Sequence, residues 1–313
     1  MGRWRSFSTV TLVLVLAFSA LAGTPGTPRF RTSAGSLEAP EVRHVADQRP
    51  VSIGWARPQV VFTGVQSPGR QRLRVLSYNI HHGEGVDGKL DLARIASVIR
   101  SVEPDIVALQ EVDQKVARTQ GVDQPEELAR LTKMQVVFGG NIALQGGAYG
   151  NAVLSRLPIL RHANHKLPCL DNGEQRGVLE LQVELPGNSQ PLRVLATHLD
   201  HRRSDQERMA SAKMIHELTV KQTDLPALLI GDLNDTPESN VLSEFGKLWI
   251  RANEKPLSTI PVTKPTRQID FILFRPKDRW IVTETKVLDE AIASDHRPIL
   301  AVFELLPRPP NEG

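Results

Sequence analysis

Residues 227–235 read Ala-Leu-Leu-Ile-Gly-Asp-Leu-Asn-Asp. Four consecutive apolar residues followed by glycine predict a short buried strand, and Asp232 and Asn234 come directly after it. Polar residues hold similar positions next to or inside other apolar segments, at Asn79, Gln110, Glu111, His198, Asp200, Asp270, Asp295 and His296. One such residue is commonly only a turn former or a helix cap. Buried polar atoms need partners, however, so a whole set predicts that these side chains serve one another or a ligand.

Apolar strands and amphipathic helices alternate on both sides of this stretch. Apolar residues at helical spacing predict a helix over 91–102 with Asp91 as its N-cap, and proline opens a second helix over 125–134. Ser204 and Glu207 predict a capping box for a third helix that runs to about residue 221. Strands are predicted at 72–80, 105–109, 151–154, 157–167, 176–185, 192–199, 227–230, 268–274, 280–287 and 298–304. Many strands and few helices in mixed order favour an α/β fold of two packed sheets with helices outside.

The first 22 residues have the pattern of a secretory signal peptide. Arg3 and Arg5 precede an apolar run, and Ala20-Leu21-Ala22 is a small-x-small cleavage site. The alternative is a membrane anchor, but the run over 10–21 is shorter than the roughly 20 residues that a spanning helix needs. We therefore expect a secreted or periplasmic protein with no transmembrane segment after cleavage.

The next segment, residues 23–70, is rich in proline and glycine and shows no sustained strand or helix period, so it is predicted to be a linker. Its alternative is a strand that pairs with the domain, for which residues 58–65 are the candidate. Residues 71–307 are predicted to form one domain, followed by a tail at 308–313.

Composition narrows the function classes. With 40% hydrophobic and 23% charged residues, the chain is neither a multi-span membrane protein nor fibrous nor wholly disordered. The formal charge is +3, and loss of Arg3 and Arg5 with the first 22 residues would leave +1, so no basic excess indicates a long polyanionic partner. Cys169 is the single cysteine, which excludes an intrachain disulfide and a cysteine-based zinc site. We expect a monomer.

Oxygen donors among the polar residues indicate a metal. Glu111, Asp232, Asn234 and Asn79 offer the hard ligands that suit Mg²⁺, or alternatively Mn²⁺, whereas zinc lacks the nitrogen and sulfur set that it prefers. An adjacent pair such as His81 and His82 would point to opposite faces of a strand, so both are not expected to bind one ion, although His81 shares the face of Asn79.

Histidines next to such a metal suit phosphate chemistry. At His198 and His296, an imidazolium can take charge from a phosphoryl oxygen and an imidazole can accept a proton from water. Asp270 can hold the second ring nitrogen of His296 and fix its tautomer.

Seven segments together resemble the endonuclease/exonuclease/phosphatase superfamily, in the order in which that superfamily has them. They are Leu-Ser-Tyr-Asn-Ile (76–80), Ala-Leu-Gln-Glu-Val (108–112), Gly-Asn-Ala-Val-Leu-Ser-Arg-Leu-Pro-Ile (150–159), Ala-Thr-His-Leu-Asp (196–200), Gly-Asp-Leu-Asn-Asp (231–235), Gln-Ile-Asp-Phe-Ile-Leu (268–273) and Ser-Asp-His-Arg-Pro-Ile (294–299). The resemblance implies a four-layer α/β sandwich, two mixed β-sheets flanked by α-helices, with a divalent metal at one end.

By position, the resemblance assigns a role to each site residue. It implies metal ligation by Glu111, Asn79 and Asp295; orientation of water and phosphate by Asp232 and Asn234; phosphate binding by His198; an acid/base pair of Asp270 and His296; and substrate contacts by Arg176 and Asn151. Two points stay open: His296 can be the base or a charge stabiliser, and an arginine that opens a strand, as Arg176 does, can equally be a surface residue. Nuclease branches often carry an acid where this chain has His81, which weakens a nuclease assignment.

The function expected from these features is that of a secreted, metal-dependent hydrolase that cleaves a small or lipid-linked phosphodiester by in-line attack of water. Apolar residues at 248–267 favour such a substrate, and the low net charge disfavours long nucleic acid. The alternatives are a secreted endonuclease or exonuclease of the same fold and, in another class, a non-catalytic binding module. Against the module, every expected catalytic position holds a competent residue.

Overall fold

The computed structural model describes residues 71–186, 190–222 and 225–307. The predicted signal peptide, the linker with its candidate strand at 58–65, and the tail at 308–313 lie outside these residues. Among the described residues, no helix combines the length and the apolar character needed to cross a membrane.

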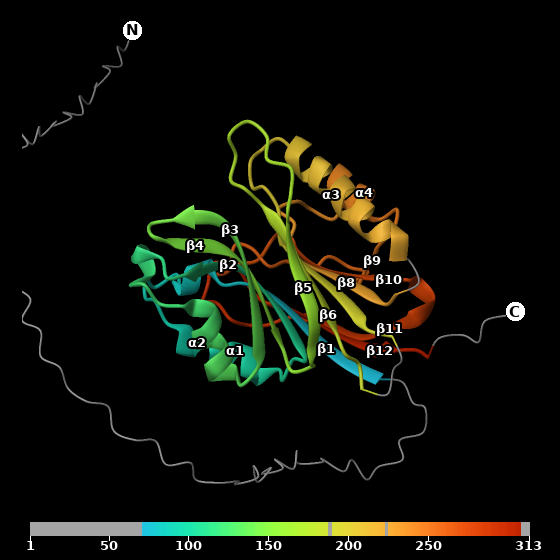
Figure 1. Ribbon diagram of the computed structural model, residues 1–313, viewed down its shortest axis with the longest axis horizontal. Helices are drawn as coiled ribbons and strands as arrows, with labels where there is room; N and C mark the ends of the chain where they lie inside the picture. The colour runs from blue at the N-terminus through green and yellow to red at the C-terminus, as the bar shows by residue number, and fades with distance from the viewer. Residues whose placement is uncertain (1–70, 187–189, 223–224, 308–313) are drawn as a thin grey trace, which may run out of the picture. The chain divides into compact units, whose positions relative to one another are not determined.

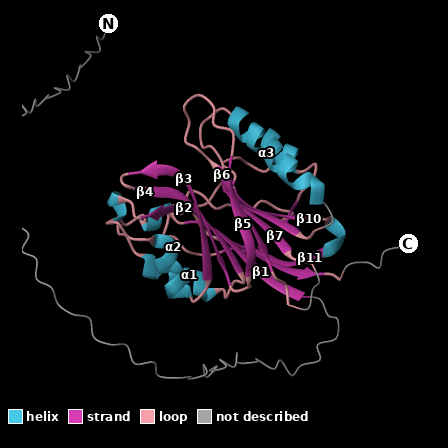
Figure 2. Cartoon of the chain, viewed as in Figure 1, coloured by secondary structure: helices cyan, strands magenta, loops and turns pink. Residues whose placement is uncertain are grey.

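Two six-stranded sheets form the centre of the domain (Figure 2). The first sheet has the order β11 (Trp280–Val287), β12 (Ile299–Leu305), β1 (Gln71–Asn79), β2 (Ile106–Gln114), β4 (Gly147–Ser155) and β3 (Gln135–Leu144). The second has the order β5 (Ile159–Lys166), β6 (Gly177–Val183), β7 (Leu192–His198), β8 (Ala227–Asp232), β10 (Asp270–Arg275) and β9 (Ile250–Arg251). Both sheets are mixed, because β1 runs parallel to β2 and β7 runs parallel to β8 while the other neighbours are antiparallel.

Helices cover the outer face of each sheet. Helices α1 (Leu92–Ser101) and α2 (Gln124–Thr132) lie against the first sheet, and α3 (Gln206–Thr219) and α4 (Asn240–Phe245) lie against the second (Figure 1). The short 3₁₀ turns are η1 (His81–Gly83), η2 (Ala117–Thr119), η3 (Val220–Gln222) and η4 (Lys277–Arg279). The order helix, sheet, sheet, helix confirms the predicted four-layer α/β sandwich.

Three apolar clusters hold these layers together. The largest lies between the sheets, where residues such as Val194, Ile230 and Phe303 are fully buried. A second cluster packs α1 and α2 on the first sheet, and a third packs α3 and α4 on the second. Burial of apolar area at about 25 cal/mol per Å² is the main favourable contribution to such a fold.

Of the two capping signals predicted from the sequence, the one at α1 is confirmed and the one at α3 is wrong. Asp91 caps α1 as predicted, since its carboxylate accepts the backbone N–H of Arg94 at 2.8 Å. The capping box at α3 is wrong: Asp205 is the N-cap and makes no side-chain cap bond. The Glu207 carboxylate instead accepts hydrogen bonds from Leu170 and Arg202 at 2.6 Å, because charged and backbone donors of a neighbouring loop compete for it.

Besides the short 3₁₀ turns, one helix and two strands were not predicted from the sequence. Strand β3 contains Gly139-Gly140, a turn signal, and lies at the edge of its sheet, where side chains are only partly buried and give no clear apolar pattern. Helix α4 and strand β9 are six and two residues long, which is too short for a periodicity to emerge.

Candidate active site

Strand register aligns three predicted site residues at one end of the second sheet. His198 on β7 lies beside Asp232 on β8, and Asp232 lies opposite Asp270 on β10. Each of the three is the terminal residue of its strand, at the same edge of the sheet. All three side chains are buried, so they must find partners among themselves or in a ligand.

A bulge presents Glu111 from the first sheet. The pairing of β2 with β4 shifts register between Leu109 and Val112, and Glu111 adopts a φ of 59°. A bulge bends the strand and re-aims a side chain, which here turns Glu111 toward the second sheet. The sequence had predicted that the strand ends at Leu109. That prediction is wrong, because β2 continues through the bulge to Gln114.

Asn79 joins the two sheets at the site. Its side-chain amide donates to Oε1 of Glu111 at 3.0 Å and to Oδ2 of Asp232 at 3.2 Å, while its Oδ1 accepts the backbone N–H of His81 at 3.1 Å. Ser294 donates to the Asn79 carbonyl at 2.7 Å and brings the following Asp295 and His296 to the same place. Asn79 therefore lies between two carboxylates from different sheets, and its role as a metal ligand stays a prediction.

His296 lies between two carboxylates. Its Nδ1 is 2.9 Å from Oδ2 of Asp270, and its Nε2 is 3.8 Å from Oδ2 of Asp232. The Thr259 hydroxyl donates to the same Asp270 oxygen at 2.5 Å. Burial opposes protonation of His296, but the carboxylates around it, Asp270 first, outweigh burial and raise its pKa to about 10. Burial, and then the charge of Asp270, raise the pKa of Asp232 to about 7.

His198 has the opposite electrostatic environment. Arg176 approaches its Nδ1 at 3.2 Å, and the His198 Nε2 is 3.6 Å from Oδ2 of Asp232. Burial, followed by the charge of Arg176, lowers the pKa of His198 well below its ordinary value. Because the arginine donates to Nδ1, the neutral ring carries its proton on Nε2 and can act as a hydrogen-bond donor there.

Arg176 is buried and is not a surface residue. Only 3% of it is exposed, although the sequence left a surface position open. Besides His198, its guanidinium contacts Nδ1 of His201 at 3.2 Å and pairs with Glu174 at 2.9 Å. It thus holds a cation next to the histidines, in a geometry that suits an anionic ligand.

These residues surround a cavity of about 500 Å³. Its lining contains the predicted residues Glu111, Arg176, His198, Asp232, Asn234, Asp295 and His296, together with His81, His82, Arg118, Ile142, Leu144, Tyr149, Glu174 and His201. Asp270 and Asn79 lie behind the lining, as described above. Asn151 is not among the lining residues, because its buried amide donates to the Gly177 carbonyl at 3.1 Å.

Asn234 and Asp295 complete the predicted set. The backbone N–H of Asn234 donates to Oδ1 of Asp232 at 2.9 Å, and its side-chain amide donates to the Leu199 carbonyl at 3.0 Å. This leaves its side-chain oxygen for a ligand. Asp295 is exposed at the cavity, next to buried His296.

Sequence reasoning missed the wall formed by η2, β3 and β4. Arg118 is held by Asp113 through bonds of 2.7 and 2.9 Å and lies 5.4 Å from the centre of the Tyr149 ring. Ile142 and Leu144 come from β3, which the sequence did not reveal. No local pattern marks these residues, because they reach the site through pairing of an edge hairpin.

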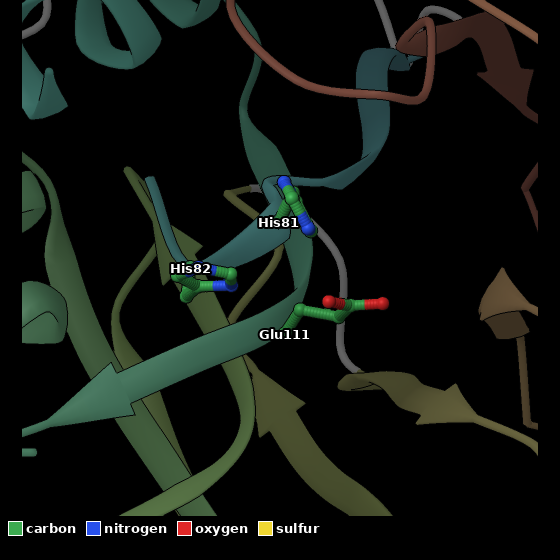
Figure 3. A group of neighbouring side chains, drawn as sticks. All are labelled: His81, His82 and Glu111. Carbon is green, nitrogen blue, oxygen red and sulfur yellow. The ribbon is translucent and has the colours of Figure 1, made fainter. Parts of the chain in front are cut away.

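The adjacent histidines are placed differently from the prediction. His81 and His82 are not on a strand but in the turn η1, with φ of 45° and 44°, so the alternation of strand faces does not apply. Their ring centres are 4.5 Å apart, and both side chains lie near Glu111 (Figure 3). One ligand atom from each of the three lies within 4.8 Å of the others. The premise of the prediction, that the two side chains point to opposite faces of a strand, is therefore wrong.

The segment 248–267 does not line the cavity. Trp249 and Val262 are 2% and 3% exposed, and Trp249 packs in the cluster beneath α3 and α4. The substrate contact expected from this segment is wrong for Trp249 and Val262, because these two side chains are buried in the domain. What the segment contributes to the site is the Thr259 hydroxyl on Asp270.

The site and the fold define a class of protein. The profile of the Endonuclease/Exonuclease/phosphatase family matches residues 76–296, so the chain belongs to this family of phosphate-ester hydrolases. The chain is 29% identical over 246 residues to the "Uncharacterized protein YbhP" of Escherichia coli (strain K12), covering 74% of this chain and 96% of that protein.

Solved structures share the fold. An endonuclease/exonuclease/phosphatase from Beutenbergia cavernae DSM 12333 matches with a TM-score of 0.65 and 26% identity, covering 75% of this chain and 72% of the other. The Bacteroides thetaiotaomicron VPI-5482 mannosyl-6-phosphatase Bt3783 matches with a TM-score of 0.63 and 19% identity, covering 74% and 99%. The human Nocturnin catalytic domain matches with a TM-score of 0.59 and 20% identity, covering 76% and 97%.

Proposed function

We propose that the protein is a secreted, divalent-metal-dependent hydrolase of small or lipid-linked phosphodiesters. The observation that carries this proposal is the placement of Asp270, His296 and Asp232 in one hydrogen-bonded and ion-paired row, with Glu111 and Arg176 in the same cavity. Such a row can activate water and stabilise charge, while a carboxylate and a guanidinium can hold a metal and a phosphate.

The donor chemistry of the cavity fits a hard divalent ion. Glu111 and exposed Asp295 offer carboxylate oxygens, Asn79 lies beside Glu111, and the type of ligand suits Mg²⁺ or Mn²⁺. When bound, the metal supplies a positive charge that polarises the phosphoryl group. The ion would be held by Glu111 and Asp295, with Asn79 as an additional or orienting group.

The protein side chains have separate roles in the hydrolysis step. A water oxygen bonds to phosphorus as the bond to the leaving oxygen breaks on the opposite side, and Asp232 accepts the proton of that water. Asn234 orients the water or a phosphate oxygen. The raised pKa of His296 keeps it protonated near neutral pH, so it acts as a charge stabiliser rather than as the base. Asp270 holds that imidazolium in place, and the neutral His198 donates from Nε2.

The cavity favours a short diester over a long polyanion. Arg118 is neutralised by Asp113 and Arg176 by Glu174, so the two arginines add little net positive charge around the site. Ile142 and Leu144 provide an apolar wall that suits an acyl chain or another apolar leaving group. This wall, and not the segment 248–267, is the apolar feature that favours a lipid-linked substrate, because that segment does not line the cavity.

A substrate panel tests the proposal. Purified protein with Mg²⁺ is given a phospholipid, a model diester, a model monoester, plasmid DNA and single-stranded DNA, each across a salt series, with Asp232→Asn as the inactive control. We expect the fastest turnover on a diester and little dependence on salt. A nuclease that contacts six to ten phosphates would lose affinity by roughly 10³ to 10⁵-fold between 50 and 200 mM salt. Preferred cleavage of DNA with that dependence would favour the nuclease, and inactivity on every ester would favour a binding module.

Export rests on the first 22 residues, where a short apolar run precedes Ala20-Leu21-Ala22. Cleavage after Ala22 would give a mature protein that begins at Gly23. Intact-mass analysis of material recovered outside the cytoplasm tests this, and retention of residues 1–22 would contradict it.

A further inference from the structure

We infer that His81, His82 and Glu111 form a binding site for a divalent transition-metal ion of the Zn²⁺ type. The site differs in chemistry from the oxygen ligands of the proposed hydrolase, because two of its three donors are imidazoles. Glu111 belongs to both ligand sets. The cavity would therefore contain oxygen ligands in one set and imidazole ligands in the other, with Glu111 common to the two.

The three donors are close enough to surround an ion. One nitrogen of each histidine and one oxygen of Glu111 lie within 4.8 Å of one another. Tetrahedral ligands about 2.1 Å from an ion are about 3.4 Å apart, so small side-chain rotations bring these atoms into range. The side chains extend from the turn η1 and from the bulge of β2 into the same space (Figure 3).

Glu84 orients both imidazoles. Its backbone carbonyl is 3.0 Å from Nδ1 of His81, which fixes the proton on that nitrogen and leaves the lone pair on Nε2. Its carboxylate is 3.6 Å from Nε2 of His82, which is too long for a hydrogen bond, but its negative charge favours the proton on this nitrogen and leaves the lone pair on Nδ1. Metal-binding histidines commonly have this arrangement, in which the second ring nitrogen is held by a carbonyl or a carboxylate.

The Nδ1 atom of His82 has a further property. It is buried and has no hydrogen-bond partner. A buried polar atom without a partner is costly and calls for an explanation. A metal ion that accepts its lone pair would satisfy it.

The backbone supports the same assignment. His81, His82 and Glu111 have φ of 45°, 44° and 59°, in the left-handed region that residues other than glycine rarely adopt. Such strained conformations persist where surrounding structure enforces them, and they cluster at ligand sites. Here all three donor residues have such a backbone conformation, on two segments that are distant in the sequence.

The donor set selects the type of ion. Imidazole binds Zn²⁺ and other transition ions well, whereas Mg²⁺ prefers oxygen ligands and retains water. Two histidines and one glutamate leave a coordination position open, as in catalytic rather than structural zinc sites. The proposal does not depend on the substrate of the hydrolase, because ion binding is measured without turnover.

Calorimetry on tag-free, EDTA-treated protein tests the inference. Zn²⁺ and Mg²⁺ are titrated separately, and Co²⁺ is titrated as a spectroscopic substitute whose visible absorption reports nitrogen ligation. The variants are His81→Asn and His82→Asn, because asparagine tolerates a positive φ and lacks the imidazole. His162→Asn is the matched control, since His162 is exposed on β5 and outside the cavity.

A second control removes the other candidate ligand group. Asp232, Asp270 and His296 also offer three donor atoms within 4.8 Å of one another, so Asp232→Asn tests whether Zn²⁺ binds there instead. Circular dichroism and thermal unfolding check that each variant is folded.

We expect each variant of His81 or His82 to weaken Zn²⁺ binding by more than about 10-fold and to change the Co²⁺ spectrum. The His162 and Asp232 variants should keep Zn²⁺ affinity within about threefold of the wild type, and the His82 variant should keep its Mg²⁺ affinity. Unchanged Zn²⁺ affinity in both folded histidine variants would overturn the inference, as would loss of Zn²⁺ binding only in Asp232→Asn. Absence of Mg²⁺ binding with Zn²⁺ binding retained would contradict the magnesium assignment alone.

Discussion

Nδ1 of His296 lies 2.9 Å from Oδ2 of Asp270, and both side chains are buried, with His296 in the cavity wall and Asp270 behind it. The pair crosses from the loop before β12 in the first sheet to β10 in the second. The Asp270 carboxylate holds Nδ1 of His296 and thereby orients Nε2 toward Asp232, whose Oδ2 is 3.8 Å away.

Loss of either member of this pair should slow the reaction. We expect His296→Ala to lower kcat by at least ~10²-fold, the usual scale for a positioned proton-transfer or charge-stabilising group, and Asp270→Asn to act in the same direction more weakly. The double variant should lose less than the product of the two single losses, because the residues share one task. Independent, multiplicative losses would separate Asp270 from His296.

The pH dependence of kcat gives a second test of Asp270→Asn. Carboxylates around His296 raise its pKa to about 10, so a reaction that needs the imidazolium should persist into the alkaline range in the wild type. Asp270→Asn removes the leading cause of that rise, so the alkaline loss of kcat should move to lower pH. A pH–rate profile measures the shift, and an unchanged alkaline limb would argue against a protonated His296.

Removal of the Glu111 charge should abolish most activity. Glu111→Gln keeps the shape of the side chain but takes away its charge, and we expect a loss of at least about 10²-fold in kcat/KM, comparable with EDTA treatment. Glu126→Gln is the matched control, because Glu126 is exposed in the first turn of α2. Activity that survives EDTA, or that survives Glu111→Gln nearly intact, would contradict the metal assignment.

The guanidinium geometry of Arg176, and not only its charge, should be needed for activity. Its guanidinium contacts His198 and His201 at 3.2 Å each, and a lysine cannot make both contacts. We expect Arg176→Lys to raise KM and lower kcat by about 10-fold or more. Arg161→Lys on the exposed face of β5 should leave both constants unchanged. Equal behaviour of the two variants would indicate that Arg176 has only a structural role.

Acid should destabilise the fold through His216. Burial lowers the pKa of this half-buried imidazole more than the nearby Glu244 raises it. Protonation therefore favours the unfolded chain, and the free energy of unfolding falls as pH drops below the ordinary value of about 6.5. We expect His216→Gln to show a smaller fall between about pH 7 and pH 5 in chemical denaturation, whereas His162→Gln should follow the wild type. Equal slopes in all three proteins would contradict the assignment.

Local sequence sufficed for features that depend on near neighbours. The apolar runs that form β1, β7, β8 and β12, and the helical face of α1 with its Asp91 cap, follow from side-chain spacing and capping chemistry. The sequence motifs also predicted the polar residues at strand ends, because polar groups next to a buried strand need partners. Most of them do line one cavity, as Glu111, His198, Asp232 and His296 show.

Only the tertiary structure decided how the two sheets meet. Asn79 donates to Asp232, 153 positions further along the chain, and such pairing has no local signal. The edge strand β3 and the cavity residues Ile142 and Leu144 depend on sheet pairing in the same way. Burial of Trp249 and Val262 likewise depends on what packs over them, since an apolar residue stabilises a core and a binding surface by the same physical effect.

The backbone conformation of His81 and His82 could not be predicted from the sequence. The two residues are adjacent, and the alternation of side chains along a strand predicted that they point to opposite faces. The left-handed φ values of the turn instead bring both rings near Glu111. Residues other than glycine enter this region only when surrounding structure compensates the strain, so the compensation comes from contacts distant in the chain. The sequence determined which ligand types are present, and tertiary structure determined which of them share a site.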